Sequence, residues 1–154
     1  MSVQIVLGSK SDMKVAQKAI AVLKELGIKY KLSIASAHRT PELVDKLVRE
    51  ADAEVFIAIA GLSAALPGVI AARTIKPVIG VPVSGTLNLD SILSVVQMPP
   101  GVPVAGVGLD RGENAALLAA AMLAIKDERI RKALTNYRQK LKDRVVQDSK
   151  EVET

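Results

Sequence analysis

Residues 3–35, VQIVLGSKSDMKVAQKAIAVLKELGIKYKLSIA, contain the pattern that decides the fold. An apolar run, Val3–Leu7, is followed by a helical pattern over Met13–Leu26 and then by a second apolar run, Leu32–Ala35. In the helical part, apolar residues recur on one side while lysine and glutamate lie largely opposite, and Gly27 is placed to cap the end. A strand, a helix and a second strand in this order predict a βαβ unit with parallel strands.

The rest of the chain continues this alternation. Three further apolar runs follow at Val55–Ala60, Val78–Val83 and Val102–Val107, and several runs are continuous, as in strands that are covered on both faces. Helical patterns separate the runs, one starting at Pro41 and the others at about 65–74, 89–97 and 113–125. Five strands alternating with helices predict an α/β three-layer sandwich, with a flavodoxin-like sheet of five parallel strands in the order 2-1-3-4-5.

An additional helix is expected after the sheet is complete. The segment 127–145 carries one apolar stripe, made of Ile130, Leu134, Tyr137, Leu141 and Val145. Such a stripe packs either on its own domain or on a neighbouring subunit, and both interpretations stay open. We expect residues 1–154 to form a single domain, with a frayed end over 147–154.

Composition excludes several classes of function. The chain has 154 residues, of which 49% are hydrophobic and 24% charged, so it suits one globular domain and not a disordered chain. The net charge is +5, but much of it lies in the mixed-sign segment 126–154, which is typical of a solvated helix face. With one Phe, two Tyr and no Trp, a base-stacking platform is not expected, so we predict no nucleic-acid partner.

Cysteine is absent and His38 is the single histidine, which excludes disulfides, a thiolate nucleophile and clusters of cysteine or histidine around a metal. Residues 55–72 carry no charge, but Gly61, Pro67 and Gly68 interrupt them. A strand, a turn and a short helix therefore fit better than a membrane span. The N-terminal sequence lacks the pattern of a secretory signal, so a cytoplasmic location is predicted.

Polar or glycine-bearing loops follow three strands that neighbour one another in the predicted sheet. They are Gly8–Asp12, Ser36–Pro41 and Ala60–Ala64. In such a sheet, ligands bind beyond the carboxyl ends of the strands, at the point where the strand order reverses. We therefore expect the three loops to meet around one ligand site.

The first of these loops runs into a helix N-terminus, where free amide groups and the helix dipole favour an anion such as phosphate. Ser9 and Ser11 add hydroxyl donors, and Asp12, which would repel a phosphate, suits the hydroxyls of a ribose. Helix capping by Ser11 or Asp12 explains the loop equally well. The loop does not match a P-loop, and the later glycines Gly106, Gly108 and Gly112 miss the dinucleotide-binding fingerprint by one residue.

The second loop combines His38 with Arg39 at the predicted start of a helix. Imidazole can take up and release a proton near neutral pH, and guanidinium suits bidentate phosphate binding. A lone histidine is also commonly structural or simply exposed. The pattern alone leaves a catalytic and a structural interpretation about even.

Five motifs occur in order along the chain: Gly8-Ser9-Lys10-Ser11-Asp12, Ser36-Ala37-His38-Arg39-Thr40-Pro41, Leu66-Pro67-Gly68, Gln97-Met98-Pro99-Pro100-Gly101-Val102-Pro103 and Asn114-Ala115-Ala116-Leu117-Leu118-Ala119. Over residues 3 to about 145 they closely resemble the N5-carboxyaminoimidazole ribonucleotide mutases of purine biosynthesis. The resemblance implies a homo-octamer whose C-terminal helix embraces a neighbour, and a pathway partner that makes the carbamate substrate with ATP. It also implies a reaction without cofactor or metal, which moves a carboxylate from the exocyclic nitrogen of aminoimidazole ribonucleotide to carbon 4.

The resemblance also implies roles for individual residues. His38 would be the general acid/base that moves protons between the substrate nitrogen and carbon 4. The 5′-phosphate would be held by Ser9, Ser11 and Arg39, and the ribose by Asp12. The pocket for the imidazole and CO2 would be lined by Ser36, Ala37, Gly61 and Leu62. A closed pocket suits this reaction, because free CO2 would otherwise escape before its recapture.

One position departs from the family pattern. Bacterial mutases usually carry a second histidine directly before Leu-Pro-Gly, where this chain has Ala65. A sister class, aminoimidazole ribonucleotide carboxylase, uses free CO2 and also lacks that histidine, but it typically has lysine in place of Arg39 and lacks Pro67. The resemblance therefore favours the mutase. The carboxylase is one alternative, and a non-catalytic nucleotide-binding oligomeric module is another of a different class.

Overall fold

In a computed structural model that describes residues 1–152, five parallel strands form one sheet in the order β2-β1-β3-β4-β5. The strands are β1 (Ser2–Leu7), β2 (Lys29–Ile34), β3 (Val55–Ala60), β4 (Val78–Pro82) and β5 (Ala105–Gly106). The predicted flavodoxin-like order is confirmed.

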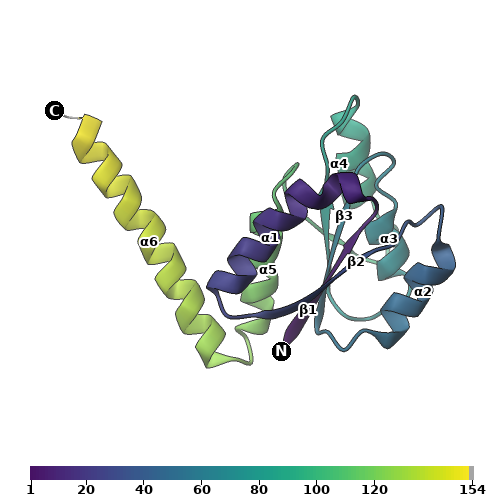
Figure 1. The fold of residues 1–154 in the computed structure, drawn as a ribbon, viewed down its shortest axis with the longest axis horizontal. Coiled ribbons are helices and arrows are strands. Elements are labelled where there is room, and N and C mark those ends of the chain that lie inside the picture. The colour runs from purple at the N-terminus through teal and green to yellow at the C-terminus, as the bar shows by residue number, and fades with distance from the viewer. Residues whose placement is uncertain (153–154) are drawn as a thin grey trace.

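Helices cover both faces of the sheet (Figure 1). One face carries α1 (Met13–Glu25), preceded by the short turn η1 (Lys10–Asp12), and α5 (Gly112–Leu123). The opposite face carries α2 (Pro41–Glu50), α3 (Leu66–Ala71) and α4 (Asn88–Val96). The fold is therefore the three-layer sandwich that the alternation of patterns predicts.

The central strands are almost purely aliphatic because both of their faces are covered. Every residue of β3 and β4 is buried. Successive side chains alternate between the layers, so Ile57 packs beneath α1 and α5 while Phe56 and Ala58 pack beneath α2 and α3. These two apolar layers hold the carboxyl ends of the strands, and the loops that follow them, in a common plane.

Helices α1 and α5 approach each other closely where α5 begins. A Cβ atom added to Gly112 would lie 2.1 Å from the carbonyl oxygen of Val15, so this position has no room for a side chain. Small residues continue the contact, since Ala115, Ala116 and Ala119 are fully buried. Glycine and alanine therefore set the spacing of these helices over the sheet.

Two strands differ from their predicted bounds by more than one residue. β2 begins at Lys29 and not at Leu32, because it pairs with β1 over six residues; it lies at the edge of the sheet and is largely exposed. β5 has only two residues, although the sequence predicts a strand over Val102–Val107. Pro103 has no N–H to donate, and the N–H of Val102 bonds to the carbonyl of Pro99 in a turn, so pairing starts only at Ala105.

The last helix, α6 (Glu128–Val152), is longer than the predicted segment 127–145. The frayed end expected from 147 is wrong for residues 147–152, while 153–154 lie outside the described residues. Ile130 is buried against the core, but Leu141 and Val145 are 48% and 68% exposed. Figure 1 shows α6 leaning away from the sandwich. Only the first part of its apolar stripe is therefore covered by its own domain.

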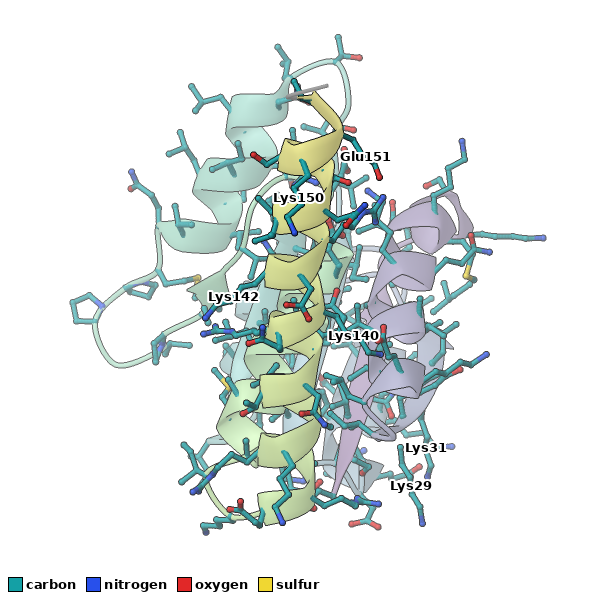
Figure 2. The ribbon with its side chains drawn as sticks, turned by 90° about the vertical axis from the view of Figure 1, so that its left-hand side faces the viewer. Lys29, Lys31, Lys140, Lys142, Lys150 and Glu151 are labelled. Carbon is teal, nitrogen blue, oxygen red and sulfur yellow. The ribbon has the colours of Figure 1, made fainter. Side chains whose placement is uncertain are left out.

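One ion pair links α6 back to the domain. In Figure 2, Lys140 extends from α6 toward α1, where its Nζ lies 3.0 Å from Oε1 of Glu25. Lys142 points to the other side of the helix. Within residues 1–152, no helix combines the length and the apolar content that crossing a membrane requires. The uncharged residues 55–72 instead form β3, a turn and α3, as predicted.

Candidate active site

The loops after β1, β2 and β3 enclose a cavity of about 470 Å³ at the carboxyl edge of the sheet. All nine residues singled out in the sequence line this cavity: Ser9, Ser11, Asp12, Ser36, Ala37, His38, Arg39, Gly61 and Leu62. Three separate segments of the chain thus supply one site, at the point where the strand order reverses.

The β1 loop is held by a reciprocal cap. The backbone N–H of Ser11 donates to Ser9 Oγ at 3.3 Å, and the N–H of Ser9 donates to Oδ2 of Asp12 at 3.0 Å. The hydroxyl of Ser11 donates to Oδ1 of the same carboxylate at 3.3 Å. Asp12 is only 6% exposed, so it orders the loop from within while the two serines lie closer to solvent.

Burial and hydrogen bonding act in opposite directions on Asp12. Burial raises the pKa of this carboxyl, and the hydrogen bonds from Ser9 and Ser11 and the charge of Arg39 lower it, with burial prevailing, so that the pKa lies above its usual value. Each carboxylate oxygen already accepts one hydrogen bond and keeps one further lone pair. Structural capping and the acceptance of a ligand hydroxyl are therefore compatible at this residue.

The β2 loop is a closed turn that presents His38 outward. Ser36 and Thr40 form three hydrogen bonds with each other: the N–H of Ser36 donates to Thr40 Oγ1 at 2.9 Å, and the N–H and the hydroxyl of Thr40 donate to the Ser36 carbonyl at 3.0 and 3.3 Å. His38 lies between them, is exposed, and has no hydrogen bond from its ring among residues 1–152. The turn thus holds an uncommitted imidazole at the cavity.

Arg39 connects the first two loops. Its Nε donates to Ser36 Oγ at 3.2 Å and its Nη2 donates to the carbonyl of Gly8 at 3.1 Å. Within the described part of the chain, Nη1 and the second proton of Nη2 have no partner. Two anchors thus orient the guanidinium and leave three N–H donors for a ligand anion.

The β3 loop supplies the remaining wall; the sequence placed Ala60–Ala64 at the site but assigned a role only to Gly61 and Leu62. Beyond Gly61 and Leu62, the wall includes Ser63, Ala64 and Ala65. Leu62 is 79% exposed, while Ala64 is buried with a positive φ of 54°. The sequence signal for Ser63 as a wall residue was its position in a loop after a buried strand. A single serine between apolar residues forms no motif that indicates a ligand contact.

A second polar cluster ties together the loops after β4 and β5, outside the cavity. Asp110 has a φ of 58°, its Oδ1 accepts the N–H of Ser84 at 2.9 Å, and its carbonyl accepts from Lys18 Nζ at 3.0 Å. Burial raises the pKa of Asp110, but the hydrogen bonds from Ser84 and the charges of Lys18 and Arg111 outweigh it, so that the pKa is lower than usual. The sequence offered no local sign of this link.

The described residues contain no group of three or more His, Cys, Asp or Glu side chains that could hold a metal ion. The side chains of the cavity instead combine hydroxyls, a guanidinium, a carboxylate and an imidazole. These groups can bind an anion and a sugar hydroxyl and can move a proton. The fold and this cavity define a flavodoxin-like α/β protein with a polar cavity at its topological switch point.

Comparison with known proteins narrows this class. The chain matches the AIR carboxylase family over residues 2–144. It is 58% identical over 149 residues to the N5-carboxyaminoimidazole ribonucleotide mutase of Methanocaldococcus jannaschii, covering 96% of this chain and 95% of the relative. A protein of the same name from Pyrococcus abyssi is 51% identical over 145 residues, covering 91% and 83%. The chain therefore belongs to the AIR carboxylase family.

A solved structure agrees with the sequence relatives. The crystal structure of Treponema denticola PurE is similar with a TM-score of 0.90 at 32% identity, covering 99% of this chain and 98% of that one. The resemblance inferred from the five sequence motifs is thus confirmed at the level of the family and of the fold.

Proposed function

We propose that this protein converts N5-carboxyaminoimidazole ribonucleotide to 4-carboxyaminoimidazole ribonucleotide in purine biosynthesis. The observation that carries the proposal is the presence, in one cavity, of an uncommitted imidazole, His38, and an oriented guanidinium, Arg39. A site that only binds a nucleotide has no need of a side chain that can give and take a proton. The relatives that share about half or more of the sequence carry the name of this mutase.

In the proposed complex, the 5′-phosphate binds between Ser9, Ser11 and Arg39. The free N–H donors of the guanidinium and the hydroxyls of the β1 loop face the same cavity, so they can share one anion. Asp12 accepts a ribose hydroxyl through a remaining lone pair. The imidazole ring and CO2 occupy the part of the cavity lined by Ser36, Ala37, Gly61 and Leu62.

The proposed reaction balances without any added reactant. The bond between the exocyclic nitrogen and the carboxylate carbon breaks, which releases CO2 and leaves a nitrogen that takes up a proton from His38. Carbon 4 of the ring then attacks CO2, a carbon–carbon bond forms, and the proton on carbon 4 returns to His38. One imidazole therefore gives and regains one proton, and the net reaction is an isomerisation.

The alternative of a CO2-dependent carboxylase has one observation in its favour, because Ala65 stands in the cavity wall where the resemblance places a second histidine. Arg39 and Pro67 agree with the mutase pattern instead, and the relative with 58% identity is named a mutase. We therefore keep the mutase as the proposed activity.

The decisive experiment supplies the carbamate in buffer stripped of bicarbonate and then adds carbon-13 bicarbonate. A mutase forms the product at full rate, with little label in the new carboxylate. Strict dependence on bicarbonate would instead establish the carboxylase. His38→Asn should abolish turnover but keep the fold and ribonucleotide binding, and a variant that retained near-normal turnover would remove His38 from the mechanism.

A homo-octamer is the assembly that we propose. The apolar side chains in the second half of α6 support an assembly of subunits, because Leu141, Val145 and Val146 are 48–68% exposed. A neighbouring subunit that covers them would remove this apolar surface from water. Light scattering tests the assembly: Leu141→Glu combined with Val145→Glu should lower the mass, and an unchanged mass would contradict a role of this stripe. The cytoplasmic location and the ATP-dependent synthetase as a partner stay predictions.

A further inference from the structure

The wall formed by the β3 loop contains one polar side chain. Six consecutive residues, Gly61 to Leu66, line the cavity, and Ser63 is the only one among them with a side-chain hydrogen-bond donor. Its neighbours are glycine, leucine and alanine. A carboxylate placed against such a wall loses water and needs a replacement donor, because an ionised group without one is costly to bury.

The hydroxyl of Ser63 is also the one that the loops leave unused. Ser9 and Ser36 each accept a backbone N–H of their own loop, and Ser11 donates to a carboxylate. Across the described residues 1–152, Ser63 forms no hydrogen bond through its hydroxyl, and it is exposed to the cavity. Its proton is therefore available to a ligand without breaking an internal contact.

We propose that Ser63 is a specificity-determining residue, whose hydroxyl donates a hydrogen bond to the carboxylate that is transferred. This inference rests on the proposed function, which places the phosphate on the β1 and β2 loops, against Ser9, Ser11 and Arg39. The carboxylate then faces the β3 loop in both substrate and product, and one donor can hold it before release and after recapture of CO2. Nothing else in the side chains of that wall distinguishes a carboxylated ribonucleotide from the same ribonucleotide without the carboxylate.

The test compares two ligands that differ only in this group. Calorimetry with Ser63→Ala should show an affinity for 4-carboxyaminoimidazole ribonucleotide about tenfold lower, because one hydrogen bond to a charged group is lost. The affinity for aminoimidazole ribonucleotide should stay within about twofold of the native value. In turnover, KM for the carbamate should rise by about the same factor as the product affinity falls, and kcat should not fall, because the contact is made to the carboxylate before CO2 is released.

Two further variants separate this role from a structural one. Ser63→Thr keeps the hydroxyl and should restore the preference for the carboxylated ligand. Ser149→Ala makes the same chemical change at an exposed serine near the end of α6 and should change neither affinity. Equal losses for both ligands, or no loss for either, in Ser63→Ala would overturn the assignment.

The proposed function can fail separately. If the native protein does not convert the carbamate but still prefers the carboxylated ligand through Ser63, the activity is wrong and the carboxylate contact stands. If the native protein converts the carbamate and Ser63→Ala has the same ligand affinities as the native protein, only the proposed carboxylate contact is wrong. If the native protein binds neither ribonucleotide, both proposals are wrong.

Discussion

Replacing Arg39 with alanine should weaken binding of the ribonucleotide but not of the matching phosphate-free nucleoside. The guanidinium is oriented by hydrogen bonds to Ser36 Oγ and to the carbonyl of Gly8, at 3.2 and 3.1 Å. It therefore meets a ligand in one orientation and loses little side-chain entropy on binding. Its three remaining donors can form two charge-assisted bonds with a phosphate.

The magnitude follows from these donors and from the exposure of the site. A hydrogen bond to a charged group contributes about 1.5–3 kcal/mol. Arg39 is exposed, so water weakens the pair, and we expect about that much for the whole phosphate contact and not for each bond. Since about 1.4 kcal/mol is tenfold in affinity, Arg39→Ala should lower ribonucleotide affinity about 10- to 150-fold. Arg39→Lys keeps the charge but not the two anchoring hydrogen bonds, so its affinity for the ribonucleotide should lie between the affinities of the native protein and of Arg39→Ala.

Titration calorimetry with aminoimidazole ribonucleotide and with its nucleoside measures this difference directly. Raising the salt concentration should reduce the difference in ribonucleotide affinity between the native protein and Arg39→Ala, because the contact with the phosphate is ionic. Thermal unfolding provides the control, since an exposed side chain contributes little to stability. An equal loss of affinity for ribonucleotide and nucleoside would refute the phosphate role of Arg39.

Two predictions concern the fold. Gly112→Ala should lower the free energy of unfolding in urea by at least about 2 kcal/mol, because the new Cβ would lie 2.1 Å from the Val15 carbonyl oxygen, whereas Gly85→Ala, with open space, should change little. Equal effects would contradict this packing argument. Asp110→Asn should reduce stability at pH 7. Because the pKa of Asp110 in the native protein is lower than its ordinary value of 3.8, the ionised carboxylate stabilises the fold above pH 3.8. This stabilisation is lost as the pH falls through the lower native pKa, so the difference in stability between the native protein and Asp110→Asn should shrink on acidification. A difference that stays constant from pH 7 to pH 3 would contradict the prediction.

The sheet could be predicted because its signals are local. β3 and β4 are covered on both faces, and this leaves an unbroken aliphatic run that is visible in one strand at a time. Gly27, with a φ of 65°, ends α1 as the pattern indicates. The rule that ligands bind at the carboxyl edge then brought the loops with Ser9 and His38 together.

The misjudged features depend on partners distant in the chain. β2 begins at Lys29 because β1 offers six residues for pairing, and an edge strand shows little apolar periodicity. The bond from Ser84 to Asp110 joins two loops 26 residues apart. The composition of neither loop indicates such a contact.

The sequence by itself determined the layer architecture and the chemical groups available to the site, since hydrophobic periodicity, glycine positions and side-chain chemistry belong to single segments. The strand order followed from the alternation of these segments along the chain. Only the tertiary structure decided which of those groups are free. Among residues 1–152 it shows Asp12 buried and accepting two hydrogen bonds, Arg39 anchored with three N–H donors free, and the hydroxyl of Ser63 without a hydrogen-bond partner. Hydrogen-bond saturation depends on the positions of atoms from separate loops, and packing of the sheet against its helices sets those positions.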